Sequence, residues 1–258
     1  VLLTYCFNYM AENPIETADS LISDYLVLVH HQLGLRRLCD SSNGLFLRFS
    51  EDCLVNLSKI PETELTQIMS CRYHYRVKLY GQFPVDHYTV KSADLNKQSA
   101  EELASFILPL CFRTNPLTQT PRNDLKQVVD DLFEIIGDPD VEADAALSEN
   151  TVTVEKFIDR SLIGPRFVKE AFYGLLALEM ASLHYANKVA QKGLYFVEAV
   201  LLFNTYKIRK KSAQSRTVEL ERIITILTYD LIYGSDRVES WVLLAQAYGY
   251  IVEDDLIW

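Results

Sequence analysis

The chain has 258 residues, of which 49% are hydrophobic and 11% aromatic, and it contains only 9 glycines and 8 prolines. This composition excludes a disordered chain and disfavours an all-β fold, because such folds need many turn residues. The formal net charge is −10. Direct binding to nucleic acid is therefore not expected, because it depends on lysines and arginines that neutralise phosphates.

The cysteines and the apolar runs indicate the cellular location that is expected for the chain. Five cysteines are scattered through a chain that is long enough to fold without disulfides, which predicts reduced thiols inside a cell. No signal peptide and no apolar run of about 18 residues is present, so we expect no membrane crossing. The sequence begins at Val1 rather than at a methionine. We interpret it as an interior piece of a longer protein.

Apolar residues recur at helical spacing along most of the chain, and they alternate with residues that begin or end helices. Gly34 and Gly81 are predicted helix ends, Asn43-Gly44 a positive-φ turn, and Ser99–Glu102 a capping box at a helix start. The predicted helices cover residues 17–34, from 45 onward, 61–81, 99–111, 120–137, 153–162, 165–191, 194–211, 218–233 and from 239 onward. A short strand is the alternative for Leu45–Phe49, but a helix is favoured because no partner strand is predicted nearby.

The C-terminal stretch carries a recognisable packing pattern. Trp241, Leu244, Ala245 and Tyr248 follow the spacing W-x2-L-[G/A]-x2-Y, which is typical of the first helix of a tetratricopeptide (TPR) repeat. The large residues share one helix face, and the alanine would allow a neighbouring helix to approach closely. These four residues are predicted to form a structural TPR-like core.

A run without basic residues, DPDVEADAALSEN, covers residues 138–150. We interpret residues 139–152 as an acidic linker or gap between an N-terminal helical-repeat segment, 1–138, and a C-terminal TPR-like segment, 153–258. Short joints between helices predict antiparallel neighbours. The predicted fold is all-α, an irregular helical-repeat (TPR-like) solenoid of antiparallel helix pairs.

Motifs for catalysis are missing from the sequence. It has no phosphate-binding glycine loop, no G-x-S-x-G elbow and no H-E-x-x-H pair. Cys71 and His74 lie on one helix face, but no second ligand pair stands at a suitable spacing, so a buried cysteine and a surface histidine are favoured over a zinc site. We therefore predict no catalytic, cofactor-binding or metal-binding residues, and no enzyme.

A basic cluster ends one of the predicted helices. It consists of Lys207, Arg209, Lys210 and Lys211. Cations are favourable at a helix C-terminus, and this explanation is preferred. The alternative is a contact with DNA or with an acidic subunit, which makes the cluster the candidate partner contact of the chain.

Several segments together resemble one family, the large TPR-bearing scaffold subunit of the HIR histone-chaperone complex, also called the histone transcription regulator or cabin family. The segments are His31–Phe49, Cys71–Gly81, Ser99–Leu110, Pro121–Asp131 and Glu239–Trp258. The resemblance implies a nuclear, non-enzymatic scaffold that holds WD-repeat and ubinuclein-type subunits. That complex deposits histones H3–H4 independently of replication and represses histone genes. The family provides no individual site residues for this chain.

Two other functions are weighed against this expectation. A generic TPR adaptor would present a clamp of lysine, arginine and asparagine along inner helix faces, whereas the bases of this chain lie mostly at helix ends. An all-α enzyme without a recognisable motif ranks last, because no convergent catalytic set is found. The acidic chain is compatible with basic partners, histones H3–H4 among them.

Overall fold

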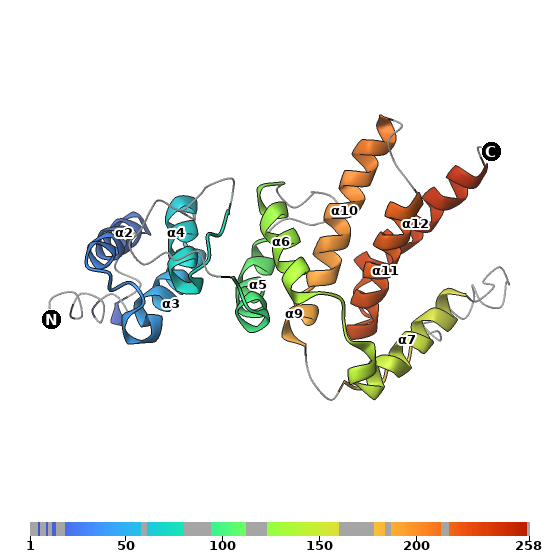
Figure 1. The fold of residues 1–258 in the computed structure, drawn as a ribbon, viewed down its shortest axis with the longest axis horizontal. Helices are drawn as coiled ribbons and strands as arrows, with labels where there is room; N and C mark the ends of the chain where they lie inside the picture. Colours follow the sequence, from blue (N-terminus) through green and yellow to red (C-terminus); the bar gives the residue numbers. More distant parts are fainter. Residues whose placement is uncertain are drawn as a thin grey trace. The chain divides into compact units, whose positions relative to one another are not determined.

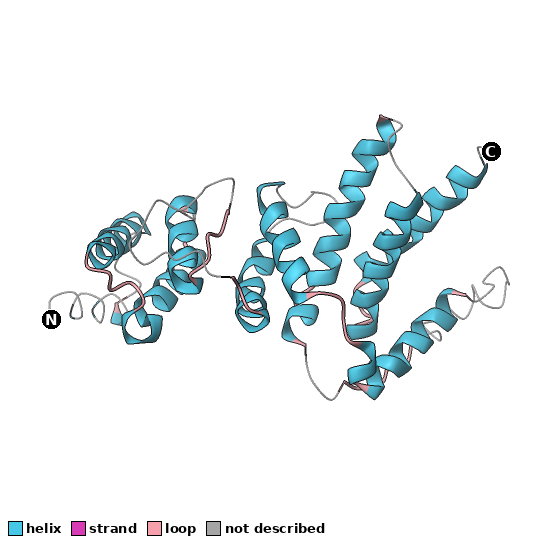
Figure 2. Cartoon of the chain, in the orientation of Figure 1, coloured by secondary structure: helices cyan, strands magenta, loops and turns pink. Residues whose placement is uncertain are grey.

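The computed structural model describes residues 5, 9, 12–13, 19–57, 61–79, 94–111, 123–159, 178–183, 187–212 and 217–256. The elements in these ranges are helices (Figures 1 and 2). They are α2 (Asp19–Leu35), α3 (Ser41–Asn56), α4 (Glu62–Tyr73), α5 (Lys97–Cys111), α6 (Asn123–Ile136), the 3₁₀ helix η1 (Val141–Ala143), α7 (Ala145–Ile158), α9 (Lys188–Gln191), α10 (Leu194–Lys211), α11 (Thr217–Tyr233) and α12 (Val238–Leu256). The all-α prediction is confirmed.

Contacts within the chain define two compact units. Unit 1 comprises Val1–Leu103 with Arg122–Val128, and unit 2 comprises Ala104–Pro121 with Val129–Trp258. The segment 139–152, expected as a linker, lies within unit 2 and contains η1 and the first half of α7. Asp144 explains the helix start, because its carboxylate accepts a hydrogen bond from the Ala146 amide at 2.9 Å and caps α7.

The turns of unit 1 follow residues in the left-handed region. Asn43 and Gly44 lie in the first turn of α3 but have φ values of 58° and 67°, which are not α-helical. The predicted positive-φ turn is thereby confirmed. After α2, however, the left-handed residue is Arg37 (φ 59°) and not Gly34, which is buried inside the helix. A hydrogen bond from the Leu38 amide to the Leu33 carbonyl closes that turn.

Helix α4 ends earlier than predicted. His74 adopts φ 51° after Tyr73 and stops the helix, whereas the sequence pattern placed the end at Gly81. The chain then turns back, and the Val77 amide donates to the Ser70 hydroxyl at 3.1 Å. A left-handed histidine costs more than a left-handed glycine, so tertiary contacts decide this end.

Two further predictions need correction. Helix α5 begins at Lys97 because the Asn96 side chain accepts from the Ser99 amide at 2.9 Å, so Asn96 is the cap in place of the expected box at Ser99. The long helix predicted over 165–191 does not extend through residues 178–183, which have no helical structure. The rest of that prediction before α9, except Asn187, lies outside the described residues.

The core of unit 2 is a row of antiparallel helices. Helix α11 packs against both α10 and α12, and α7 packs on another part of its surface (Figure 1). Tyr195 of α10 stands at the centre of an aromatic group, stacked on Tyr233 at 5.8 Å and edge-on to Phe133 of α6 at 6.0 Å. These rings join three helices of unit 2.

A buried polar group fixes the connection between α11 and α12. Asp230 is almost fully buried and bonds Arg237 at 2.5 Å and the Ser240 hydroxyl at 2.7 Å. Burial raises the pKa of Asp230, although Arg237 and Ser240 favour its charged form. The carboxylate therefore holds the start of α12 against the end of α11.

Candidate interaction groove

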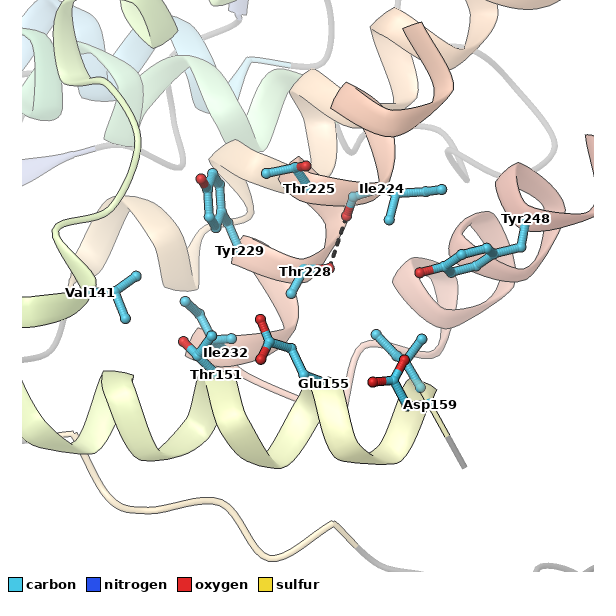
Figure 3. Close-up of a pocket in the computed structure, with 11 residues that line it drawn as sticks. Val141, Thr151, Glu155, Asp159, Ile224, Thr225, Thr228, Tyr229, Ile232 and Tyr248 are labelled. Carbon is cyan, nitrogen blue, oxygen red and sulfur yellow. Dashed lines mark hydrogen bonds between the residues drawn. The ribbon is translucent and has the colours of Figure 1, made fainter. Parts of the chain in front are cut away.

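An open groove of about 490 Å³ lies in unit 2, between α7 and α11, with α12 closing one end (Figure 3). The lining side chains come from four elements. They are Val141 of η1, Thr151, Glu155, Ile158 and Asp159 of α7 and its C-cap, Ile224, Thr225, Thr228, Tyr229 and Ile232 of α11, and Tyr248 of α12. Glu155 and Asp159 stand on the α7 side of this space, and Tyr248 reaches toward it from α12.

Helical spacing explains why these residues meet. Thr151, Glu155 and Ile158 are four and three residues apart and therefore share one face of α7. The α11 wall has the same character, because Ile224, Thr228 and Ile232 follow one another at intervals of four. Other positions of α11 are buried against neighbouring helices, so this helix has a core face and a separate groove face.

The threonines contribute little free hydrogen-bonding capacity to the groove. The hydroxyls of Thr151, Thr225 and Thr228 donate to the carbonyls of Leu147, Glu221 and Ile224 in their own helices, at 2.8 to 3.0 Å. The α11 wall is otherwise formed by isoleucines and a tyrosine. An occupant would therefore meet mainly apolar surface there.

The charge of the groove lies on α7. The side chains of Glu155 and Asp159 are exposed, and neither forms an ion pair with any residue that the structure describes. Burial, and next the Asp159 charge, raise the pKa of Tyr248. The Asp159 charge therefore acts on the end of the groove that α12 closes.

An ion pair lies close to Tyr229, another residue that lines the groove. Arg222 of α11 binds Asp138 through both guanidinium nitrogens, at 2.9 and 3.2 Å. Burial, and next the Asp138 charge, raise the pKa of the neighbouring Tyr229, while Arg222 acts in the opposite direction. The positive charge of Arg222 is therefore already matched within the chain, and the groove keeps an excess of negative charge.

The structure separates the four residues that were predicted to form a TPR-like core. Leu244 is buried, and Trp241 is half-buried, with its indole Nε1 donating to the Ser235 carbonyl at 2.9 Å and its ring edge-on to Phe157 at 5.3 Å. Ala245 and Tyr248, in contrast, are exposed. Ala247 of the same helix is fully buried. The core face is therefore rotated from the one that the repeat spacing predicted.

The predicted basic cluster is partly used within unit 2. Lys210 bonds Asp254 at 3.0 Å and Glu253 at 3.3 Å near the end of α12, and Arg209 bonds Glu219 of α11 at 2.5 Å. Lys207 lies over the Phe203 ring at 4.2 Å, and burial lowers its pKa. Lys211 is exposed. Glu253 and Asp254 both belong to α12.

A residue that holds parts of unit 2 together was missed from the sequence, because it lies in the segment that was interpreted as a linker. Asn150 of α7 is buried and bridges two other parts of unit 2. Its amide nitrogen donates to the Ala181 carbonyl at 3.2 Å and to the Ile232 carbonyl at 3.1 Å, while its oxygen accepts from the Ala181 amide at 2.7 Å. The apolar residues around it, Ala146, Leu147 and Val154, show helical spacing and could have indicated α7.

No membrane crossing was expected from the sequence, and the described helices can be compared with this expectation. Among the helices that the structure describes, none combines the length and apolar character of a membrane-spanning segment.

The fold and the groove define an all-α helical-bundle protein with an acidic, apolar-walled surface groove. Residues 113–258 match the HIR3 helical bundle domain, and residues 1–93 match the histone transcription regulator 3 helical domain. The chain belongs to the histone transcription regulator 3 family. The expected family resemblance is thereby confirmed.

Curated relatives agree with these matches. The histone transcription regulator 3 homolog of Debaryomyces hansenii is 46% identical over 94% of this chain, and that of Candida albicans is 42% identical over 92%. The homolog of Schizosaccharomyces pombe is 26% identical over 93%. The chain spans only 14% to 15% of the length of these relatives. Their names describe regulators of histone transcription and not enzymes.

Proposed function

We propose that this chain is a non-enzymatic scaffold segment of a nuclear histone chaperone complex, which assembles H3–H4 into nucleosomes independently of replication and represses histone genes. Its partners in this proposal are WD-repeat and ubinuclein-type subunits. Family membership supports the connection to histones, since the relatives are named as histone transcription regulators. The acidic groove of unit 2 is the observation that supports a binding role for this segment itself.

The proposed occupant of the groove is a basic segment of histone H3 or H4. A lysine or arginine side chain has an apolar stem and a charged end. The stem fits the isoleucine and tyrosine surface of α11, and the charged end fits the carboxylates of Glu155 and Asp159 on α7. The net charge of −10 would also attract a basic partner before contact.

Charge reversal in the groove tests this contact. We expect Glu155→Lys with Asp159→Lys to weaken H3–H4 binding about tenfold or more, which corresponds to about 1.4 kcal/mol, because like charges would then face the basic segment. The measurement is the affinity of the purified chain for H3–H4 tetramers at several salt concentrations. Wild-type binding should weaken as salt rises.

A matched control separates the groove from the overall charge. Glu142→Lys with Glu149→Lys makes the same change in net charge at exposed positions that do not line the groove. If both double variants lose the same affinity, the groove is not the binding site. If instead the groove variant loses a WD-repeat or ubinuclein-type subunit and keeps H3–H4, the occupant belongs to that subunit.

The wider proposal is tested with the full-length protein. Affinity-tagged full-length protein from nuclear extract should recover the WD-repeat subunits, the ubinuclein-type subunit and H3–H4. Recovery of none of these would contradict the scaffold function. A generic adaptor would instead recover partners through a shared carboxylate-terminated peptide, and competition with such a peptide would then release them.

A further inference from the structure

Three buried side chains that could bind a metal meet in unit 1. They are His30 of α2, Cys39 of the turn after α2 and Cys71 of α4, and one ligand atom from each lies within 4.8 Å of the others. All three residues are nearly or fully buried. From the sequence, Cys71 was weighed only with His74 and this group was missed, because its members are 9 and 32 residues apart and fit no ligand spacing of a common zinc motif.

The local fold explains how the three residues converge. The chain reverses at Arg37, and this brings Cys39 back beside α2, where its Sγ lies 4.0 Å from the His30 carbonyl. On α4, Glu64, Gln67 and Cys71 share one face because they are three and four residues apart. That face lies against His30, since Glu64 Oε1 is 2.6 Å from His30 Nδ1.

The surrounding contacts are those of a metal-binding histidine. A ligating histidine commonly donates its other ring nitrogen to a carboxylate, which fixes the ring and makes the ligating nitrogen more basic. Glu64 provides such a carboxylate at Nδ1, so a metal would bind at Nε2. Gln67 Nε2 donates to Cys71 Sγ at 3.4 Å and supports its negative charge.

Gln67 provides a further independent observation. Only 8% of the residue is exposed, and its buried side-chain oxygen Oε1 has no hydrogen-bond partner among the described residues. A buried acceptor without a partner is costly. This oxygen, or a water molecule, could fill the fourth position that a tetrahedral ion needs beyond two sulfurs and one nitrogen.

We propose that His30, Cys39 and Cys71 bind one thiophilic metal ion, Zn²⁺ or Cu⁺, with Glu64 as the residue that orients His30. Two thiolates and an imidazole suit both ions. Bonds of about 2.3 Å to sulfur and about 2.0 Å to nitrogen require the donor atoms to approach slightly, which side-chain rotation can provide. Binding is a ligand exchange: protons held by the thiols and by Nε2 pass to solvent, and two sulfurs and one nitrogen each donate an electron pair to the ion. The site is independent of the groove, which belongs to unit 2.

The first experiment uses the unchanged chain, purified in reductant and stripped with a chelator. Titration with Co²⁺ should produce thiolate-to-cobalt charge-transfer absorption that saturates at one equivalent and disappears when Zn²⁺ is added. A separate anaerobic titration with Cu⁺ against a coloured chelator shows which of the two ions is held more tightly. The lack of any thiolate–metal absorption, together with no retained Zn²⁺ or Cu⁺, would overturn the proposal.

Variants then assign the ligands. We expect Cys71→Ser to abolish retention of the metal, and Glu64→Gln to lower the affinity about 10- to 100-fold without removing a ligand. The matched control is Cys53→Ser, which changes another cysteine of unit 1 outside the site and should bind metal as the wild type does. Circular dichroism of each variant reports whether it is folded, and Glu64→Gln tests the site even if Cys71→Ser unfolds.

Oxidation provides the competing outcome. If Cys39 and Cys71 form a disulfide in the chelator-treated chain, and the reduced chain binds neither Zn²⁺ nor Cu⁺, the pair is a redox pair and the metal proposal is wrong. Binding that persists unchanged in both Cys71→Ser and Glu64→Gln would place the metal elsewhere and would likewise overturn the assignment.

Discussion

Asn150 illustrates how one buried polar side chain can organise a helical unit. Its three hydrogen bonds reach the end of α11 and the segment around Ala181 from a position in the middle of α7. Backbone groups that lie outside regular helices must find partners when they are buried. Asn150 supplies both a donor and an acceptor, which no apolar residue can do.

We therefore expect Asn150→Ala to lower the free energy of unfolding by about 2–4 kcal/mol, because three backbone groups lose their partners. The higher helix propensity of alanine offsets only about 0.5 kcal/mol of this loss. The measurement is urea unfolding followed by circular dichroism. Glu149→Ala, at the exposed neighbouring position, is the control and should change stability by no more than about 0.5 kcal/mol. Equal effects would show that the bridge does not contribute.

At the scale of elements, the docking of α12 depends on which of its faces is buried. Trp241 joins the start of this helix to Phe157 of α7 and to the Ser235 carbonyl. Leu244 and Ala247 provide the buried face. The other two residues of the predicted repeat pattern are exposed: Ala245 faces the solvent, and Tyr248 lines the groove.

Because of this arrangement, Trp241→Ala and Tyr248→Ala are expected to lower the free energy of unfolding by different amounts. We expect Trp241→Ala to cost about 2–3 kcal/mol, below the usual cost for a fully buried tryptophan because the ring is half-buried. Tyr248→Ala should cost less than about 1 kcal/mol. Thermal and urea unfolding of both variants provide the comparison. Similar losses in the two variants would instead support the core face that the repeat spacing predicted.

At the scale of the whole molecule, charge governs which partners are accessible. The net charge is −10, and two members of the basic cluster, Arg209 and Lys210, already bind acidic residues of unit 2. Fewer bases of this cluster therefore remain available to neutralise phosphates. The predicted weakness toward nucleic acid follows from this distribution of charge as well as from the total.

In a gel-shift assay at about 150 mM salt, we expect no complex with duplex DNA below about 100 μM protein, the weak end of non-specific binding. A shift at about 1 μM that fades with salt and is lost in Lys207→Ala with Lys211→Ala would contradict this expectation. It would also restore the basic cluster as a partner contact. H3–H4 tetramers serve as the positive control for a competent sample.

Helix positions that follow from local rules could be predicted from the sequence. The apolar spacing located α10 and α11, and Gly137 ended α6 with φ 78° as expected. Helix ends that depend on distant contacts were missed. Arg37 and His74 adopt left-handed conformations that are uncommon for residues other than glycine. The start of α7 was also missed, because its acidic composition was interpreted as that of a linker. In the structure Asp144 caps this helix, and Asn150 connects it to α11.

The sequence by itself determined the all-α class, the acidic balance and the family, because these depend on periodicity, composition and residue order. Only the tertiary structure decided which faces are core and which residues meet. The groove needs α7, α11 and α12 together, and the cluster of His30, Cys39 and Cys71 needs a chain reversal and a second helix. Such sites combine residues that are distant in sequence, so no local spacing records them.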